Sequence, residues 1–197
     1  LGNETVYFFP SSYRNSLKIG TKDTSNEILR TETLAKISAG KAAIVVSYPE
    51  AIAEKIISGK TLKANALNLT VGELTDTNLI TAYLQKQGFI QVDFVYEPGQ
   101  FSIRGSIFDI FSYSFERPYR IDFFGDEIES IRTFDIEKQL SLENKKSITV
   151  LPNISEIKTD RKSFFEFIGK ESIFIFNNVL FVKGKIMPII ELGAGFD

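Results

Sequence analysis

The first third of the chain alternates between short apolar runs and stretches with apolar side chains at helical spacing. Val6–Phe9 is an apolar run that predicts a strand, and residues 26–38 carry an apolar stripe that predicts a helix. Ala42–Val46 then predicts a buried strand, and Pro49–Ile57 a short helix with Pro near its first turn. This β-α-β-α order is typical of a parallel sheet covered by helices.

The rhythm changes after the first third. Lys63–Thr70 predicts a strand and Asp76–Gln87 a helix. Over residues 89–134 the apolar period drops towards two, with repeated turn signals, which predicts an antiparallel meander of about four or five strands. The remaining expected elements are a short helix near Arg161–Ile168 and strands at Ile173–Phe176, Val179–Val182 and Ile186–Ile190. The pattern as a whole predicts a mixed chain with α/β and α+β parts.

The chain contains no His, Cys or Trp, and these absences exclude several chemistries. Without His or Cys there is no imidazole base, thiolate nucleophile, disulfide or ordinary zinc site. The formal net charge of -2 argues against a general nucleic-acid binder, which normally carries a basic patch. No apolar run is long enough to cross a membrane, and the absence of Cys fits a cytoplasmic protein. We expect no cofactor and no metal.

Two groups of residues are similar to catalytic motifs, and simpler explanations are favoured for both. Ser58–Thr61 contains the Gly-Lys-Thr of a phosphate-binding loop, but Glu54 stands where that loop requires a glycine. The patterns around it also predict a helix before the motif and extended chain after it, the reverse of the usual context. Four carboxylates also lie close in sequence, which a solvated turn between strands explains without acid-base catalysis: Asp122, Asp126, Glu127 and Glu129. We therefore expect no catalytic residue.

Arginine is concentrated in one stretch of the chain. The sequence has 16 Lys and 7 Arg, yet four Arg lie within 29 residues that contain no Lys: Arg104, Arg117, Arg120 and Arg132. Arg is favoured over Lys at protein interfaces because its forked guanidinium pairs with carboxylates and stacks on aromatic rings. The stretch therefore predicts a protein-binding face.

Strand alternation indicates which side chains would form that face. Within Phe101–Phe111, Arg104 alternates onto the polar face and Ile107 onto the apolar face. In the next strand, Arg120 and Phe124 share the polar face. A large aromatic residue beside an Arg on a polar sheet face predicts an interface anchor. Two alternatives remain at this point: Phe124 lies under a neighbouring loop, or a bulge beside it turns it inward.

Two stretches of the sequence resemble a known family. Val95–Phe111 and Pro118–Asp135 are similar to the UvrB-homology module, which occurs in the excision-repair helicase UvrB and in the N-terminal region of the bacterial transcription-repair coupling factors. Leu69–Gly72 and Gln87–Phe89 extend the resemblance upstream. Its specific part covers about residues 67–152.

Two features favour the coupling factors over UvrB. Ser130–Asp135, followed by Gln139, is closer to the coupling-factor pattern. UvrB also carries a long aromatic-rich hairpin that grips DNA, and the interval from Pro10 to Ala42 is too short and too poor in aromatic residues to hold it. The alternative is the corresponding region of UvrB, with DNA or nucleotide binding.

The resemblance implies a degenerate helicase-like α/β domain, present in part, with an inserted and mainly antiparallel β module that carries a helix. Residues 1–57 would be the first part of that domain, residues 58–152 the UvrA-interaction module, and residues 153–197 the return segment. In UvrB, the residue after the corresponding strand is an Asp that helps hold the magnesium of ATP. Here that position is Asn177, which carries no charge for the metal, so the resemblance implies no ATPase site in this segment. Because the chain begins with Leu1, we expect a piece of a larger protein. The resemblance implies that this parent protein is an ATP-dependent DNA translocase.

The resemblance also implies a partner, because in this family the module recruits the damage-recognition protein UvrA. The matching contact residues are Arg104, Arg120 and Phe124. The two Arg would pair with acidic groups of UvrA, and Phe124 would fill an apolar pocket between them. Replacing either Arg is then expected to abolish UvrA binding without changing the melting temperature. RNA polymerase and DNA would contact the parent protein through regions absent from this chain.

The implied function is a non-catalytic docking role that links stalled transcription to nucleotide excision repair. A second hypothesis is a catalytic or nucleotide-binding fragment, which would use Asp122 with Glu127, or Lys60. A third is direct DNA binding. Nucleotide titration and a gel shift at low salt would distinguish these hypotheses from docking.

Overall fold

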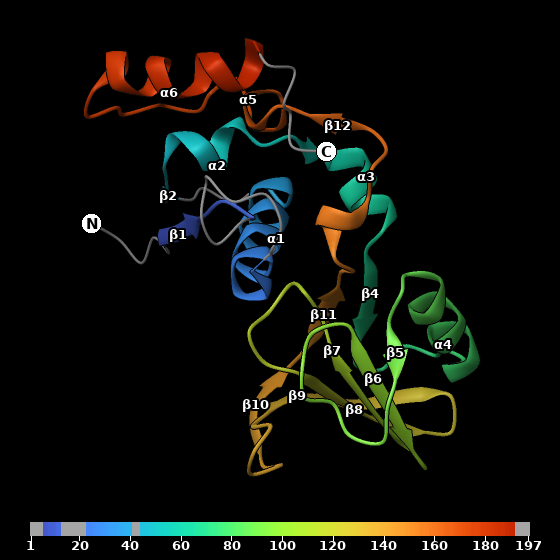
Figure 1. Ribbon diagram of the computed structural model, residues 1–197. Coiled ribbons are helices and arrows are strands. Elements are labelled where there is room, and N and C mark those ends of the chain that lie inside the picture. The colour runs from blue at the N-terminus through green and yellow to red at the C-terminus, as the bar shows by residue number, and fades with distance from the viewer. Residues whose placement is uncertain (1–5, 13–22, 41–43, 192–197) are drawn as a thin grey trace. The chain divides into compact units, whose positions relative to one another are not determined.

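The computed structural model describes residues 6–12, 23–40 and 44–191, which form a mixture of helices and sheets (Figure 1). The chain divides into two compact units. The first unit comprises Leu1–Ala64 and Ile154–Asp197, and the second comprises Asn65–Asn153. The described residues contain six α-helices and several sheets, so the expected mixed α/β character is confirmed.

The described part of the first unit contains two pairs of strands. β1 (Val6–Phe9) and β2 (Ile44–Ser47) pair in parallel, as the β-α-β pattern predicts. The expected start of the second strand, Ala42, lies outside the described residues. β3 (Ile56–Ile57) pairs antiparallel with β12 (Arg161–Lys162).

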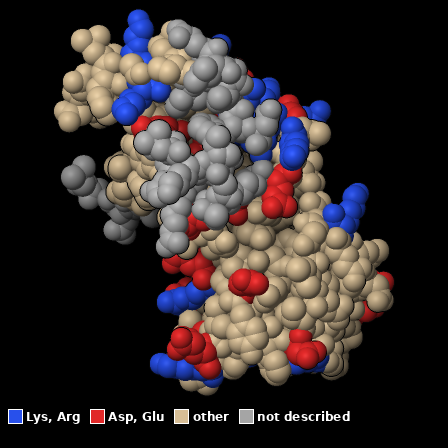
Figure 2. All heavy atoms as spheres, in the orientation of Figure 1, with Lys and Arg blue, Asp and Glu red and all other residues tan. Residues whose placement is uncertain are grey.

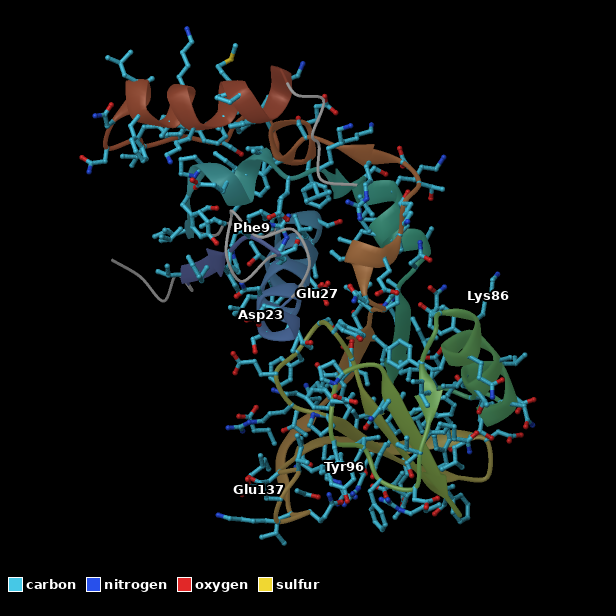
Figure 3. The ribbon with its side chains drawn as sticks, in the orientation of Figure 1. Phe9, Asp23, Glu27, Lys86, Tyr96 and Glu137 are labelled. Atoms are coloured by element: carbon cyan, nitrogen blue, oxygen red, sulfur yellow. The ribbon has the colours of Figure 1, made fainter. Side chains whose placement is uncertain are left out.

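The helix α1 (Thr24–Ser38) connects β1 to β2 and packs against β1. It begins at Asp23, whose carboxylate accepts hydrogen bonds from the N–H groups of Ser25 and Asn26 (Figure 3). Such a cap satisfies N–H groups that have no partner inside the helix. The other helices of the first unit are short or late in the chain: α2 (Pro49–Ala53), α3 (Gly59–Ala64), the 3₁₀ turn η1 (Ile154–Glu156), α5 (Phe164–Phe167) and α6 (Val179–Glu191).

A buried ion pair lies inside the first unit. The guanidinium of Arg30 is 3.2 Å from the carboxylate of Glu54 and lies 4.1 Å from the ring centroid of Phe9. Glu54 also accepts hydrogen bonds from the Ser11 hydroxyl and from the backbone N–H and hydroxyl of Ser12. A buried carboxylate needs partners of this kind because burial removes its water.

Several expected elements of this unit are wrong. The helix expected over Pro49–Ile57 ends after five residues and gives way to β3. The strand expected at Ile173–Phe176 has no regular structure, and the strands expected at Val179–Val182 and Ile186–Ile190 are parts of α6. The reason is that a continuous apolar run has no period, so it fits a strand and a helix equally well.

A six-stranded sheet forms the centre of the second unit, in the order β10-β9-β8-β7-β6-β5. Neighbouring strands are antiparallel except for β5 and β6, which are parallel. The antiparallel meander expected over residues 89–134 is therefore confirmed, because this range contains five strands, and β10 adds a sixth beyond it. The strands are β5 (Ile90–Gln91), β6 (Gln100–Arg104), β7 (Ile107–Phe111), β8 (Tyr119–Phe124), β9 (Glu127–Phe134) and β10 (Ser141–Lys145).

The core of the second unit lies against one face of this sheet. The helix α4 (Thr77–Lys86) and the antiparallel pair β4 (Leu67–Thr70) and β11 (Ser147–Val150) supply its other side. Asp76 caps α4, and Lys86 lies in its last turn, where a cation favours the helix dipole (Figure 3). The strand expected over Lys63–Thr70 begins later than predicted, because its first residues belong to α3. The largest fully buried side chains of this core are Leu69, Ile80, Leu84, Phe101, Phe108, Ile110, Ile121 and Ile128.

Candidate protein-binding face

The cross-strand register places a row of polar side chains on the sheet face opposite the core. Ser102 lies opposite Asp109, Asp109 opposite Arg120, and Arg120 opposite Arg132. Residues that are directly paired across strands project to the same face. The next row on this face runs from Arg104 through Ile107 and Asp122 to Ser130. Arg104 and Arg120 therefore share the polar face, as alternation predicts.

Ile107 lies on this face as well, which contradicts the expectation that it joins the core. The turn at Gly105 and Ser106 explains the difference, because it pairs Arg104 directly with Ile107. Simple alternation along the chain does not continue through a hairpin turn.

Asp109 is the centre of this face. Its side chain is 1% exposed, and its two carboxylate oxygens accept hydrogen bonds from two different Arg. Arg120 donates to Oδ1 through Nε and to Oδ2 through one terminal nitrogen, both at 2.8 Å, which is the forked geometry that Arg makes with a carboxylate. Arg104 donates to Oδ2 at 2.5 Å. We call Asp109, Arg104 and Arg120, with Gln139, the Asp109 cluster.

The guanidinium of Arg120 is almost entirely occupied within the protein. Besides Asp109, it donates to the side-chain oxygen of Gln139 at 3.0 Å and to the backbone carbonyl of Gln139 at 3.3 Å. It also lies 4.2 Å from the ring centroid of Phe134, and its side chain is 13% exposed. The hydrogen bond to Asp109 raises the pKa of Arg120 above its already high value, so this residue stays cationic. Gln139 has a φ of 56°, and in this conformation both of its oxygens reach Arg120.

Arg104 is the more accessible of the two cations. Its side chain is 31% exposed and lies 4.6 Å from the ring centroid of Phe94. Apart from the bond to Asp109, it donates to the backbone carbonyl of Asp93 at 2.9 Å. Within the described residues these bonds use two of its five N–H donors. The remaining donors give Arg104 the capacity to bind an acidic group of a partner.

Phe124 ends β8 and is 77% exposed. Both alternatives left open by the sequence are excluded, because the side chain is neither covered by a loop nor turned inward. A register shift does occur here, between Asp122 and Phe123, but it leaves Phe123 in the core and Phe124 on the opposite face. Phe124 lies opposite Glu127, which also bridges to Leu74, a second exposed apolar residue.

The acidic residues considered as catalytic candidates lie in β8, in β9 and in the turn between them. Asp122 is ion-paired with Arg132 and accepts a hydrogen bond from Ser130, while Asp126 and Glu127 are exposed at the hairpin turn. Among the described residues there is no group of three or more Asp and Glu side chains that could hold a metal ion. On the face that Figure 2 shows, charged side chains lie in small groups, several of which contain both acidic and basic residues.

The context expected around Ser58–Thr61 is wrong. A short strand, β3, precedes this segment and the helix α3 follows it. The Ser58 hydroxyl caps α3 by accepting a hydrogen bond from the Thr61 backbone N–H, and the Asp160 carboxylate accepts from the Ser58 and Thr61 hydroxyls. The required glycine is nevertheless replaced by Glu54, whose carboxylate is occupied by Ser11, Ser12 and Arg30. The full phosphate-loop pattern is therefore absent.

Sequence reasoning missed the residue that organises the face, although the sequence contains a signal for it. Asp109 is a single charge within the apolar run Ile107–Phe111. A carboxylate in a buried strand must find a cation or several hydrogen-bond donors, and the adjacent strands carry Arg104 and Arg120. Phe94 was missed because it lies in the loop after β5, where alternation gives no information.

No helix in the described part of the chain is long and apolar enough to cross a membrane. Residues 67–155 match the UvrB interaction domain family. The chain is 31% identical over 132 residues to the transcription-repair-coupling factor of Escherichia coli (strain K12), which covers 67% of this chain and 11% of that protein.

Other relatives have similar sequence identity and coverage. The transcription-repair-coupling factor of Bacillus subtilis (strain 168) is 30% identical over 152 residues, 77% of this chain and 13% of that protein. That of Myxococcus xanthus is 33% identical over 118 residues, 60% of this chain and 10% of that protein. The chain thus spans a small part of each of these relatives. Residues 67–155 belong to the UvrB interaction domain family, and the chain is a relative of the transcription-repair-coupling factors.

Proposed function

We propose that this chain is a non-catalytic docking region that recruits UvrA and so couples stalled transcription to nucleotide excision repair. The observation that carries the proposal is the exposure of Phe124, a residue at the end of β8 that is 77% exposed. It lies on the same sheet face as Arg104 and Arg120. An exposed aromatic side chain beside Arg is the kind of group that anchors protein interfaces.

The chemistry of this face defines what the partner must offer. Phe124 fits an apolar pocket, and its burial there would contribute about 1.5–3 kcal/mol. Arg104 offers N–H donors to a carboxylate of the partner, and the Phe94 ring beneath it supports the guanidinium. Arg120 contributes mainly by holding Asp109, since most of its donors are already used.

The two units support a wider proposal about the parent protein. The chain leaves the first unit after Ala64 and returns to it at Ile154, so the second unit is an insertion. We place residues 1–57 and 153–197 in a helicase-like α/β domain and residues 58–152 in the inserted module. RNA polymerase and DNA would bind the parent protein, a DNA translocase of the cytoplasm, outside this chain.

A binding assay with purified UvrA tests the proposal. We expect Phe124→Ala and Arg104→Ala each to weaken UvrA binding by about tenfold or more, with melting temperatures close to that of the wild type. Leu79→Ala is the apolar control, because Leu79 is 68% exposed but lies on α4. Arg117→Ala is the cationic control, because Arg117 is exposed outside the strands. Wild-type binding by both Phe124→Ala and Arg104→Ala would refute the proposal.

A further inference from the structure

A single buried carboxylate, that of Asp109, accepts hydrogen bonds from two Arg that differ in exposure. Asp109 is 1% exposed, Arg120 is 13% exposed and Arg104 is 31% exposed. One Arg is sufficient to neutralise the charge of Asp109, and Arg120 does so with forked geometry. The second Arg gives the cluster a net positive charge at its more exposed end.

We propose that Asp109 is a positioning residue, which fixes the Arg104 guanidinium in the orientation that binds an acidic group of the partner. This inference rests on the proposed docking function. A free Arg side chain on a sheet surface samples many rotamers, and binding must then restrict it. Here the Asp109 carboxylate, the Asp93 carbonyl and the Phe94 ring hold Arg104 before any partner arrives.

The order of the contacts supports this role. Arg120 binds both oxygens of Asp109 and is itself held by Gln139, so the carboxylate has a fixed orientation. The Oδ2 atom then accepts from Arg104 at 2.5 Å. Arg120 therefore acts on Arg104 through Asp109. The acidic group of the partner would thus bind the Arg104 guanidinium in an orientation that the buried Asp109 carboxylate fixes.

The test is a double-mutant cycle on UvrA affinity, measured by calorimetry with the full chain. We expect Asp109→Asn, which keeps the shape and removes the charge, to weaken UvrA binding by about tenfold or more. The same substitution in an Arg104→Ala background should change the affinity by less than about twofold, since Asp109 then has nothing to position. A purely structural role would give equal losses in both backgrounds.

A matched control separates positioning from general loss of an ion pair. Asp122 is a carboxylate on the same face, and it pairs with Arg132 outside the Asp109 cluster. Asp122→Asn should leave UvrA affinity within about twofold of the wild type. If Asp109→Asn binds like the wild type while Arg104→Ala does not, Asp109 is not a positioning residue and the docking function stands. If neither Phe124→Ala nor Arg104→Ala alters binding, the docking function itself fails.

A second measurement does not depend on the folding of Asp109→Asn. In the Arg104→Ala and Arg120→Ala variants and their combination, Asp109 remains in place. Positioning through Asp109 predicts that the two losses of UvrA affinity are non-additive by about threefold or more. Without Arg120 the Asp109 carboxylate loses its fixed orientation, so it no longer orients the Arg104 guanidinium even where their hydrogen bond persists. Additive losses would overturn the inference.

Discussion

Replacement of Arg120 by Ala should destabilise the second unit strongly. The substitution removes the forked pair with Asp109, the two bonds to Gln139 and the stacking on Phe134. It also leaves the Asp109 carboxylate, which is 1% exposed, with Arg104 as its remaining cation among the described residues. The sequence alone suggested that this variant would lose UvrA binding at an unchanged melting temperature, and the structure revises that expectation.

The magnitude follows from the burial of the pair. Removing one partner of a buried ion pair costs about 3–5 kcal/mol. Asp109 keeps its bond to Arg104, which lowers the expected loss to about 2–4 kcal/mol in the free energy of unfolding. For a unit of about 90 residues this corresponds to a fall of roughly 10–25 °C in melting temperature. Arg104→Ala should cost about 1 kcal/mol or less, because Arg104 is more exposed and Asp109 keeps its forked partner.

Calorimetric melting of the full chain measures these losses, and hydrogen exchange of the β7–β9 amides identifies the transition of the second unit. Arg117→Ala, at an exposed position of the same Lys-free stretch, should melt like the wild type. A melting temperature for Arg120→Ala within about 3 °C of the wild type would refute the structural role of this residue.

Two further predictions concern stability. Gly99 has a φ of 87°, and a Cβ there would lie 2.9 Å from the Tyr113 hydroxyl, whereas a Cβ at Gly125 meets no described atom within 4 Å. Gly99→Ala should therefore lower the free energy of unfolding in urea by about 1–2 kcal/mol more than Gly125→Ala. Equal losses in the two variants would contradict this. Hydrogen bonds from Ser58 and Thr61 hold the pKa of Asp160 below its ordinary value of 3.8. The ionised Asp160 therefore stabilises the folded state above pH 3.8, and this stabilisation is lost as the pH falls through the lower pKa of the folded state. Asp160→Asn should therefore lose less stability than the wild type between about pH 4 and pH 2, and parallel pH profiles of the urea midpoint would contradict this.

The sequence was most informative where one face of an element is buried. In β8, strict alternation separated Tyr119, Ile121 and Phe123 from Arg120 and Phe124, and burial follows that separation. The polar face could therefore be predicted before the structure was known. The roles of its two Arg could not, because alternation gives the face of a side chain and not its hydrogen-bond partners. That distinction required the register that brings Asp109 beside Arg120.

The failures share a physical cause. α6 has apolar residues on all sides, so its sequence has no amphipathic period, and its β-branched residues favoured strands. α3 is six residues long, which is too short for a periodic signal. Ser58 caps its start, and Asp160, a residue distant in sequence, accepts hydrogen bonds from the Ser58 and Thr61 hydroxyls. Tertiary contacts of this kind leave no local pattern.

The order of the six-stranded sheet also affects what can pair with its edges. One edge strand, β5, is two residues long, and the other, β10, carries Glu143 and Lys145 and has a register shift. Short edges, charged side chains and irregular registers all hinder the addition of a strand from another copy. The second unit can thus expose Phe124 and Leu74 on its surface and still resist edge-to-edge aggregation of its sheet.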